Sequence, residues 1–453
     1  MIITDTIIAP ATTVGEGGIA VVRISGPLSL EALKKYFQPT AQVQSFQSQR
    51  LYHGILVDRH GEHIDEVMAV YMAAPKTYTR DDVVEIHCHG SQQVVKAIIN
   101  LYLEQGLRLA EAGEFTYRAF INGRLDLSQA EAVARLVHAK SDSARKLSLS
   151  QVEGKLSRCI HDFTDQLRQV QVLIEAWIDF PEEDLPEEDL QGILRTVSNI
   201  KDQVSQLTDT YNTGKVLTEG VSILLAGRPN AGKSSLLNTL LGEDRAIVTD
   251  IPGTTRDLLE EGITLAGVPV RLIDTAGLRQ SEDPVEREGI RRAELKIEQA
   301  DLVLLLIDGS KPVDEQDLYS FQACKDAPTF VLRTKSDLAQ QADIDFVKQP
   351  VYSISVKTGE GVERLKGAIA KYLLGDYLQR SDTVMLTEQR HHESLVAAGR
   401  CLDNVMASLE AGQSLEFLAF DIRDSLQHLG QISGETTTDS VLSGIFSRFC
   451  IGK

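Results

Sequence analysis

The sequence predicts a multidomain protein of mixed class: an N-terminal α/β domain, an all-α domain made of two separated segments, and a doubly wound α/β domain inserted between those segments. Three observations lead to this prediction. The chain has 453 residues, enough for about three domains. A phosphate-loop motif, G-x-x-x-x-G-K-S, stands near the middle, at residues 227–234. Stretches with three- and four-residue apolar spacing lie on both sides of the region that carries it.

The N-terminal domain is expected at residues 1–118. Apolar and β-branched runs predict strands at 19–25, 67–72 and 83–89. Residues 94–105 have helical spacing. This mixture predicts a compact α/β unit.

The pattern then changes three times. In the segment 119–217, Gly and Pro almost vanish between 128 and 180, which predicts long helices. Residues 218–376 alternate strands and helices, as a doubly wound domain does. Helical spacing returns in 377–453, so we expect the two helical segments to form one domain.

Composition excludes several classes of protein. The net charge is −19, from 46 basic and 65 acidic residues, so RNA binding would need a local basic patch or a basic partner. The five cysteines are scattered, which indicates neither a disulfide framework nor a zinc finger. No apolar run is long enough to span a bilayer, and no basic region precedes the apolar N-terminus. We therefore expect a cytoplasmic protein without membrane attachment.

The phosphate-loop motif has the strand–loop–helix context that it requires. Val221–Ala226 is an apolar strand candidate, and a helix begins near Ser234. Gly227 and Gly232 let backbone N–H groups converge on phosphate oxygens. Lys233 then reaches the terminal phosphates, and the Ser234 hydroxyl ligates Mg²⁺. The alternative, a glycine-rich turn that binds nothing, does not explain these flanking elements.

Further elements follow in the order of a GTP site. Asp274 ends a strand and is suited to hold a Mg²⁺-bound water, while the Gly277 N–H faces the γ-phosphate. Asp337 can accept two hydrogen bonds from guanine that adenine does not offer. The predicted GTP contacts are Asn230, Ala231, Gly232, Lys233, Ser234, Ser235, Thr249, Asp250, Ile251, Pro252, Gly253, Thr254, Thr255, Asp274, Thr275, Ala276, Gly277, Thr334, Lys335, Ser336, Asp337, Ser355, Val356 and Lys357.

Two departures from the usual GTP site concern anchoring and catalysis. Thr334 stands where the guanine motif usually has Asn, so we expect weaker anchoring of that loop without loss of guanine preference. Leu278 stands where Ras-like enzymes have the Gln that orients water, and it cannot do so. Glu286 is the replacement candidate and joins Lys233 as a predicted catalytic residue; the alternative is a solvent-facing helix acid. Asn230 is a polar group suited to the transition-state charge.

The chain also resembles a known family. Three runs are similar to the TrmE–Era–EngA group of GTPases: 227–235, 247–257 and 274–279. Three more resemble one branch of it, the MnmE (TrmE) family of tRNA modification GTPases: 17–26, 113–126 and 449–453. The resemblance covers the full length and the same three-part order, with a Ras-like G domain inserted.

The resemblance implies that the N-terminal domain binds 5-formyltetrahydrofolate and forms a constitutive homodimer. The family's folate contacts fall on Arg23, Glu85, Arg124 and Lys453. These residues suit the ligand, because a pterin offers donors to Glu85 and a folate tail offers carboxylates to the three cations. Arg124 takes a place often held by Lys, which keeps the charge but changes the geometry.

The resemblance also implies a K⁺ ion in place of an arginine finger, and two G domains that meet face to face during turnover. The implied metal ligands are Ser234 and Thr255 for Mg²⁺, and Asn230, Thr249, Ile251 and Thr254 for K⁺. Glu286 matches the family's catalytic glutamate. The implied partner is MnmG, an FAD enzyme with which the family converts the wobble uridine of certain tRNAs to 5-aminomethyl or carboxymethylaminomethyl derivatives.

Two features leave alternatives open. Cys450 is either a nucleophile or redox group beside the folate site, or a small apolar residue that helps the C-terminal tail to pack. His87 and His89 share a strand face with Glu85. A metal site is conceivable there, but a polar, ligand-facing wall without metal is the preferred interpretation.

Two rival functions come from other classes. An Era-like ribosome-assembly factor would be a GTP-switched RNA-binding module, and it predicts a basic domain after the G domain, where this chain has acidic helices. A folate-dependent one-carbon enzyme merely regulated by GTP is the other. Deletion of Lys453 separates these ideas from the leading one.

Overall fold

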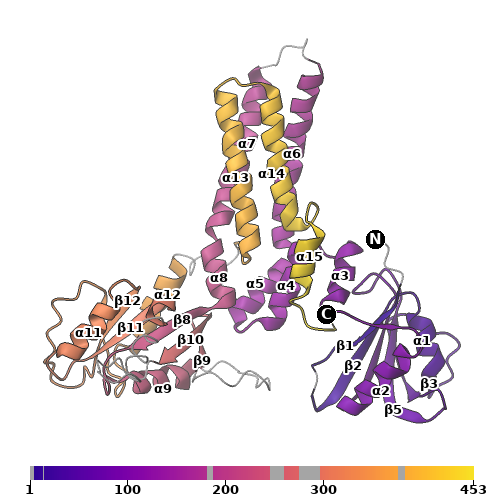
Figure 1. Ribbon diagram of the computed structural model, residues 1–453, viewed down its shortest axis with the longest axis horizontal. Helices are drawn as coiled ribbons and strands as arrows, with labels where there is room; N and C mark the ends of the chain where they lie inside the picture. Colours follow the sequence, from indigo (N-terminus) through magenta and orange to yellow (C-terminus); the bar gives the residue numbers. More distant parts are fainter. Residues whose placement is uncertain are drawn as a thin grey trace. The chain divides into compact units, whose positions relative to one another are not determined.

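The computed structural model describes residues 5–13, 15–180, 187–244, 260–274, 296–375 and 383–452. The chain divides into two compact units. Unit 1 comprises Met1–Ala134, Gln151–Leu185 and Ala407–Lys453, and unit 2 comprises Arg135–Ser150 and Pro186–Met406. Each unit joins one β-sheet to long helices (Figure 1).

The sheet of unit 1 has the strand order β3-β4-β5-β6-β2-β1-β7 within the described residues. Neighbours are antiparallel except β1 and β7, which are parallel. The strands are β1 (Ile7–Pro10), β2 (Gly17–Ser25), β3 (Phe37–Pro39), β4 (Arg50–Val57), β5 (His63–Met72), β6 (Val83–Gly90) and β7 (Arg108–Leu109).

Because side chains alternate along each strand, the two faces of this sheet meet different partners. On β1, Ile8 joins a core that includes residues of helices α1 (Ser29–Tyr36) and α2 (Gln92–Leu103). Its neighbour Ile7 joins a second core on the opposite face, with Phe115 of α3 (Glu114–Ile121). The strands and the helix predicted for the N-terminal domain are therefore confirmed.

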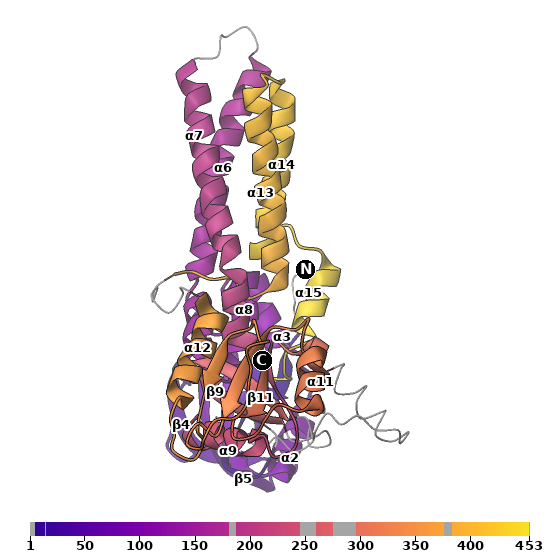
Figure 2. The ribbon, with the colours of Figure 1, turned by 90° about the vertical axis from the view of Figure 1, so that its left-hand side faces the viewer.

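The C-terminal helices of unit 1 pack on segments far away in the sequence. Helix α6 (Lys155–Asp179) lies beside α14 (Leu415–Ser433) (Figures 1 and 2). Ion pairs at 2.9 Å and 3.3 Å join them, the first from Arg168 to Glu435 just beyond α14 and the second from Arg423 to Glu175. Helix α15 (Asp439–Phe446) packs against the start of α4 (Leu127–His138) through the buried ring of Phe446.

Unit 2 contains the remaining described helices of the all-α part. In this unit, Lys201 of α7 (Glu187–Asp209) forms an ion pair with Asp403 of α13 (Gln389–Glu410). Two shorter helices complete the set, α5 (Asp142–Val152), which begins in this unit, and α8 (Tyr211–Glu219).

The sheet of unit 2 is a doubly wound sheet with the order β13-β12-β11-β8-β10-β9 among the described residues. All neighbours are parallel except β9 and β10. Its elements are β8 (Val221–Ala226), α9 (Lys233–Asp244), β9 (Glu260–Leu265), β10 (Val268–Asp274), β11 (Leu302–Asp308), α11 (Glu315–Ala323), β12 (Thr329–Thr334), β13 (Val351–Ser353) and α12 (Val362–Leu374).

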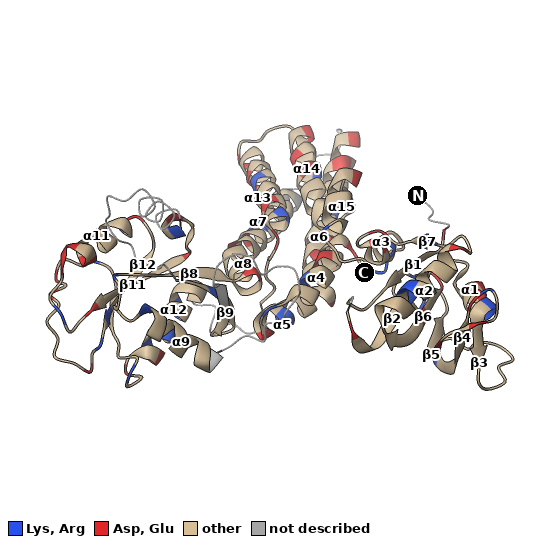
Figure 3. Cartoon of the chain, turned by 60° about the horizontal axis from the view of Figure 1, so that its bottom comes forward, with Lys and Arg blue, Asp and Glu red and all other residues tan. Residues whose placement is uncertain are grey.

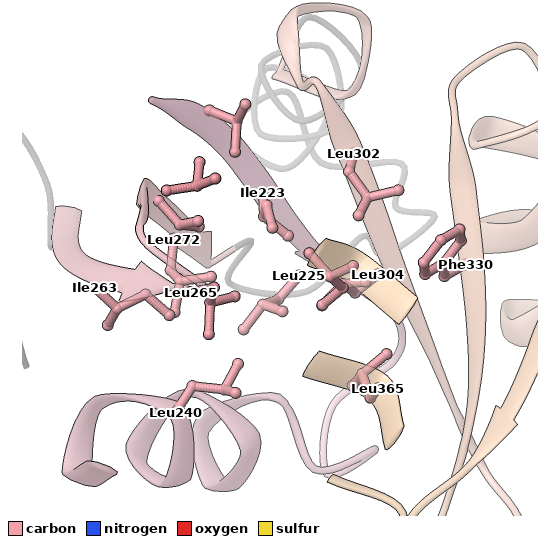
Figure 4. Close-up of a cluster of buried hydrophobic side chains, with 14 of the residues drawn as sticks. Ile223, Leu225, Leu240, Ile263, Leu265, Leu272, Leu302, Leu304, Phe330 and Leu365 are labelled. Carbon is pink, nitrogen blue, oxygen red and sulfur yellow. The ribbon is translucent and has the colours of Figure 1, made fainter. Parts of the chain in front are cut away.

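The central strand β8 explains why the residues before the phosphate loop are apolar except for Ser222. All six of its residues are buried. Ile223 and Leu225 face a core shared with Leu240 of α9 and Leu365 of α12 (Figure 4). Leu224 faces the opposite core, on the side of α11. A parallel strand covered on both faces is mainly apolar, and its one polar side chain, Ser222, bonds to Asp301. This pattern confirms the predicted doubly wound domain.

Two whole-chain expectations can be set beside the described residues. Among the described helices, none is long and apolar enough to cross a membrane. Acidic and basic positions both occur on the elements of each unit (Figure 3).

Candidate functional site

The phosphate loop connects β8 to α9 and depends on glycine at its first position. Gly227 has φ +131°, and a Cβ there would lie 2.4 Å from the carbonyl oxygen of Leu306 on β11. Gly232 has φ +103° and Asn230 has φ +65°, so the loop turns back repeatedly through left-handed conformations. This path aims backbone N–H groups into the loop, as phosphate binding requires.

Lys233 already lies inside the loop. Its side chain is 8% exposed, and its ammonium donates to the carbonyl oxygens of Gly227 at 2.6 Å and Arg228 at 2.9 Å. A buried ammonium with oxygen partners on one side suits the terminal phosphates of a nucleotide. The donor set therefore fits a nucleotide phosphate group, and the Ser234 hydroxyl at the exposed start of α9 is available to its Mg²⁺ ion.

Thr334 connects the guanine loop to the phosphate loop. It is 2% exposed and ends β12. Its hydroxyl lies 2.8 Å from the carbonyl oxygen of Ala231 and 3.2 Å from that of Ile307, and it donates to these two oxygens. The hydroxyl thus supplies a contact between the two loops in place of the usual Asn.

Asp337 is fixed by Ser355, so the two predicted base-side loops meet. The buried Ser355 hydroxyl donates to an oxygen of the exposed Asp337 carboxylate at 2.7 Å. This hydrogen bond is the largest of the effects that lower the pKa of Asp337 below its ordinary value. The carboxylate therefore stays ionised, with an acceptor oxygen left for a guanine. Ser336 and Lys357 flank these residues in the same two loops.

Sequence reasoning missed a carboxylate that supports this site. Asp308, at the end of β11, is 2% exposed and pairs with the Lys335 ammonium at 2.6 Å. Burial raises the pKa of Asp308, but hydrogen bonds from Lys335 and Ser310 outweigh it, and the pKa is lowered. The sequence signal was available, because Asp308 ends a buried strand beside the phosphate loop.

Arg228 was also missed, although it lies inside the motif. Its guanidinium pairs with Asp314, the N-cap of α11, and lies 3.4 Å from Asp317. Burial raises the pKa of Asp317, whereas the hydrogen bonds at the N-cap and Arg228 hold the pKa of Asp314 low despite its own burial. The phosphate loop is therefore tied to the start of α11.

Several predicted residues fall outside what the structure describes. For Asp274 only the backbone is described, as the last residue of β10. The residues outside the described ranges are Thr249, Asp250, Ile251, Pro252, Gly253, Thr254, Thr255, Thr275, Ala276, Gly277, Glu286 and Lys453. Their roles remain predictions from the sequence.

Unit 1 brings two predicted folate contacts together. Arg23 on β2 and Glu85 on β6 are direct cross-strand partners, and their side chains form an ion pair at 2.8 Å. Both side chains are only about one-fifth exposed, at 22% and 20%. A guanidinium and a carboxylate held side by side can meet a ligand that has both acceptors and donors, such as a pterin ring.

Two aromatic rings, which sequence reasoning missed, surround this ion pair. The Arg23 guanidinium lies 5.6 Å from the ring centre of Phe115 and 5.8 Å from that of Tyr78. Arg124 lies over the Tyr78 ring at 4.7 Å, so three of the four predicted contacts belong to one cluster. Burial raises the pKa of the Tyr78 phenol, which is in hydrogen-bond contact with Thr116 at 2.9 Å. Tyr78 therefore stays neutral at physiological pH.

The C-terminal tail reaches the same part of unit 1. The Gly113 N–H donates to the carbonyl of Cys450 at 3.4 Å, and Ile451 forms an antiparallel bridge with Ala112. Gly452 has φ +97°, and a Cβ there would lie 2.0 Å from the carbonyl oxygen of Pro10. On β1, Pro10 follows Ala9, the cross-strand partner of Arg23. The tail is thus seated beside the strand pair that carries Arg23.

The cysteine and histidine candidates occupy ordinary places. Cys450 is exposed, which leaves both of its proposed roles open. His87 and His89 do face the same side of β6 as Glu85, since Ile86 and Cys88 between them are buried. His89 is in hydrogen-bond contact with Asp65 at 2.7 Å. Burial raises the pKa of Cys88 to about 11, so this thiol is inert at neutral pH.

A nucleotide loop between β8 and α9, with a Thr-Lys-Ser-Asp loop beside it, defines the class of this protein as a P-loop GTPase. Comparisons give the family. The profile "GTP-binding protein TrmE N-terminus" matches residues 6–124, and the profile "MnmE helical domain" matches residues 127–450. The chain belongs to the MnmE family of tRNA modification GTPases.

Relatives of full length support this assignment. The tRNA modification GTPase MnmE of Syntrophotalea carbinolica is 46% identical over 100% of both chains. The protein of the same name from Geobacter sulfurreducens is 44% identical, again over 100% of both. Among solved structures, the G domain of the T. maritima FeoB iron transporter is 33% identical, with a TM-score of 0.27, and covers 34% of this chain and 98% of that chain.

Family membership confirms the resemblance given by the sequence. The protein is a GTPase that acts in tRNA modification, and its family uses GTP and Mg²⁺. The three-part fold class is confirmed as well.

Proposed function

We propose that the chain is a potassium-stimulated GTPase of the cytoplasm that works with MnmG, an FAD-dependent enzyme. Together they form the 5-aminomethyl or carboxymethylaminomethyl group on the wobble uridine of certain tRNAs, with a tetrahydrofolate as one-carbon donor. Two chains form a homodimer, and GTP hydrolysis drives their G domains together. The proposed domains are residues 1–118, 119–217, 218–376 and 377–453.

The observation that carries the folate part is the tail seated against Pro10 and Gly113. Without that contact, the last residues of the chain would have no reason to act with Arg23 and Glu85. Gly452 is seated beside the strand pair that carries Arg23, and the proposed contact Lys453 is the next residue in the sequence. In the proposed complex Glu85 accepts from the pterin ring, and the cations meet the tail carboxylates.

The nucleotide part rests on the loops around Lys233. In the proposed complex, Lys233 contacts the β- and γ-phosphates, Ser234 and Thr255 hold Mg²⁺, and Asp337 receives the guanine N–H groups. Asn230 is exposed on the loop, as a ligand of K⁺ must be. The other proposed K⁺ ligands are Thr249, Ile251 and Thr254, and Glu286 is the proposed residue that orients the attacking water.

Nucleoside mass spectrometry of tRNA from cells that lack the protein tests the whole proposal. We expect the C5-modified wobble uridines to disappear and to return when the gene is restored. Normal wobble uridines in the deletion strain would contradict the proposal. The control is a gene that encodes Lys233→Ala, which we expect to be inactive as a GTPase. If the modification depends on GTP hydrolysis, this variant will not restore the modified uridines.

Purified protein tests the separate parts. Deletion of Lys453 is expected to weaken 5-formyltetrahydrofolate binding while GTP hydrolysis continues. Hydrolysis is expected to be faster in K⁺ than in Na⁺, and equal rates would remove the assignment of Asn230. A Glu286→Ala chain that hydrolyses GTP normally would remove the assignment of Glu286.

A further inference from the structure

A pocket opens beside the Arg23–Glu85 site, within unit 1. It has a volume of about 510 Å³ and is formed by the segment that leads from β5 to β6, together with Arg124. Lys76, Tyr78 and Arg80 are among its lining residues. This volume lies within the range of small-molecule binding sites.

The pocket is basic, in a chain whose net charge is −19. Three of its lining residues are the cations Lys76, Arg80 and Arg124, and its lining contains no carboxylate among the described residues. All three side chains belong to exposed residues, so their charged groups are open to a ligand in water. Such a cluster suits a ligand that carries several negative charges.

Nearby carboxylates are engaged elsewhere. Asp82 accepts a hydrogen bond from the Ala74 N–H at 2.9 Å and bonds to Tyr71. Asp81 is in hydrogen-bond contact with Asn122, and the charge of Arg118 acts on it as well. Neither of these two acids is among the residues that line the pocket.

The rim of the pocket is held in place before any ligand binds. Arg80 has φ +62°, and its guanidinium donates to the carbonyl of Asn122 at 2.8 Å. The Asn122 amide in turn donates to the carbonyl of Thr79 at 2.6 Å. A non-glycine residue in this left-handed conformation is uncommon, and it is kept here by contacts across the pocket's edge.

Tyr78 connects the pocket to the Arg23–Glu85 site. Its ring lines the pocket, lies under Arg124 and faces Arg23. A ligand whose ring system contacts Glu85 can therefore extend past Tyr78 and place its other end in the basic pocket. The tail of a folate is a chain of glutamates, and each added glutamate brings one more carboxylate.

We propose that the pocket lined by Lys76, Arg80 and Arg124 binds the carboxylates of an oligoglutamate tail on the folate. The inference rests on the proposed folate function and names the form of that ligand which the protein prefers. Lys76 and Arg80 bind the carboxylates of the added glutamates, whereas Arg124 also binds the part of the folate that the monoglutamate has. Because the contacts are exposed, each one contributes modestly and is weakened by salt.

Calorimetry with two probes tests the proposal: 5-formyltetrahydrofolate with one glutamate and the same compound with three. For the intact chain at low salt, we expect the triglutamate to bind about five- to tenfold more tightly. The double substitution Lys76→Gln with Arg80→Gln is expected to remove this difference and to leave monoglutamate binding unchanged. Salt at 0.5 M is expected to reduce the difference in the intact chain.

Arg59→Gln is the matched control. It removes one exposed cation at the turn between β4 and β5, at the far end of β5 from Met72 and the pocket. We expect it to keep the preference for the triglutamate. Thermal melting of both variants checks that unit 1 is folded.

Three results would overturn the proposal. Equal affinity of the intact chain for both probes would remove it and leave the folate function standing. A double variant that keeps the preference, or that loses affinity for tRNA instead, would assign the cations to another ligand. Failure of the intact chain to bind the monoglutamate would overturn the folate function and this inference together.

Discussion

The nucleotide site of unit 2 and the Arg23–Glu85 site of unit 1 are built in different ways. The phosphate-binding part of the first lies in one short loop, and its lysine bonds to carbonyls five and six positions away. The second joins Arg23 to Glu85, 62 positions away, and receives the C-terminal tail. A site made by one loop depends on local backbone geometry, whereas a site made by distant segments depends on the fold of the whole unit.

The largest expected effect comes from removing an ion pair between residues far apart in the sequence of unit 1. Arg118 is 1% exposed, and its guanidinium reaches Glu114 at 2.9 Å and Asp5 at 2.7 Å. Arg118→Met removes the hydrogen bonds that its guanidinium makes to the carbonyl and carboxylate of Asp5 and to Glu114, although Arg108 still pairs with Glu114. We expect unit 1 to lose about 3 kcal/mol of unfolding free energy. Differential scanning calorimetry measures this loss, and GTP hydrolysis below the melting temperature is expected to persist.

Arg59→Met is the control for that substitution. Its ion pair with Glu104 is 64% and 54% exposed, so we expect a loss below about 0.5 kcal/mol. If the two variants were equally stable, the ion pairs of Arg118 with Asp5 and Glu114 would not stabilise unit 1. If GTP hydrolysis fell together with the stability of unit 1, the nucleotide site would not be independent of unit 1.

The next effect concerns the nucleotide loop. Gly227→Ala places a Cβ 2.4 Å from the Leu306 carbonyl oxygen and forces Ala to adopt a positive φ. We expect GTP affinity to fall about a hundredfold, while folate binding stays unchanged. Fluorescent-nucleotide titration measures the first and calorimetry the second.

Gly242→Ala, on the helix α9 that follows the phosphate loop, provides a matched change, since a Cβ there meets nothing within 4 Å. It is expected to bind GTP normally. A Gly227→Ala chain with normal affinity would show that the loop does not depend on its backbone geometry.

The pH dependence of stability gives a second test of the ion pair between Arg118 and Glu114. Burial raises the pKa of Glu114, but hydrogen bonds from Arg108, the Glu111 backbone and Arg118 together lower it below 4.5. Because the folded pKa is below the unfolded one, the stabilisation is complete above the unfolded value and is lost as the pH falls through the folded value. We expect the melting temperature of unit 1 to fall more steeply with acid in the intact chain than in Arg118→Met. Equal slopes would contradict the role of Glu114.

The smallest expected effect separates the two nucleotide loops. Thr334→Ala removes the hydroxyl that bonds to the Ala231 carbonyl, and we expect GDP to dissociate about tenfold faster. Stopped-flow release of a fluorescent GDP measures the rate. Thr334→Ser keeps the hydroxyl and is expected to behave as the intact chain does. If Ala and Ser gave the same rate, the hydroxyl would not be the anchor.

This contrast also explains what the sequence could predict. Local patterns suffice for the doubly wound domain, because β8 is apolar on both faces and the phosphate loop follows it directly. They also give the alternation of His87 with buried neighbours on β6. The folate contacts came from a family resemblance, since no local pattern distinguishes Arg23 from an ordinary strand-end charge.

The missed residues share one physical reason. Tyr78 lies in a loop, and it joins Arg23 only because β6, β2 and β1 are neighbours in the sheet. Arg228 finds Asp314 only because α11 begins beside the phosphate loop. Such contacts follow from the order of strands, which the spacing of residues along the chain does not specify.

The central claim is that the C-terminal tail completes the Arg23–Glu85 site independently of the nucleotide site. Gly452→Ala tests it most directly, because a Cβ there would lie 2.0 Å from the Pro10 carbonyl, whereas one at Gly444 meets nothing within 4 Å. We expect Gly452→Ala to weaken 5-formyltetrahydrofolate binding about tenfold, with GTP hydrolysis unchanged, and Gly444→Ala to change neither. Unchanged folate affinity in Gly452→Ala, or an equal loss of GTP hydrolysis, would contradict the account.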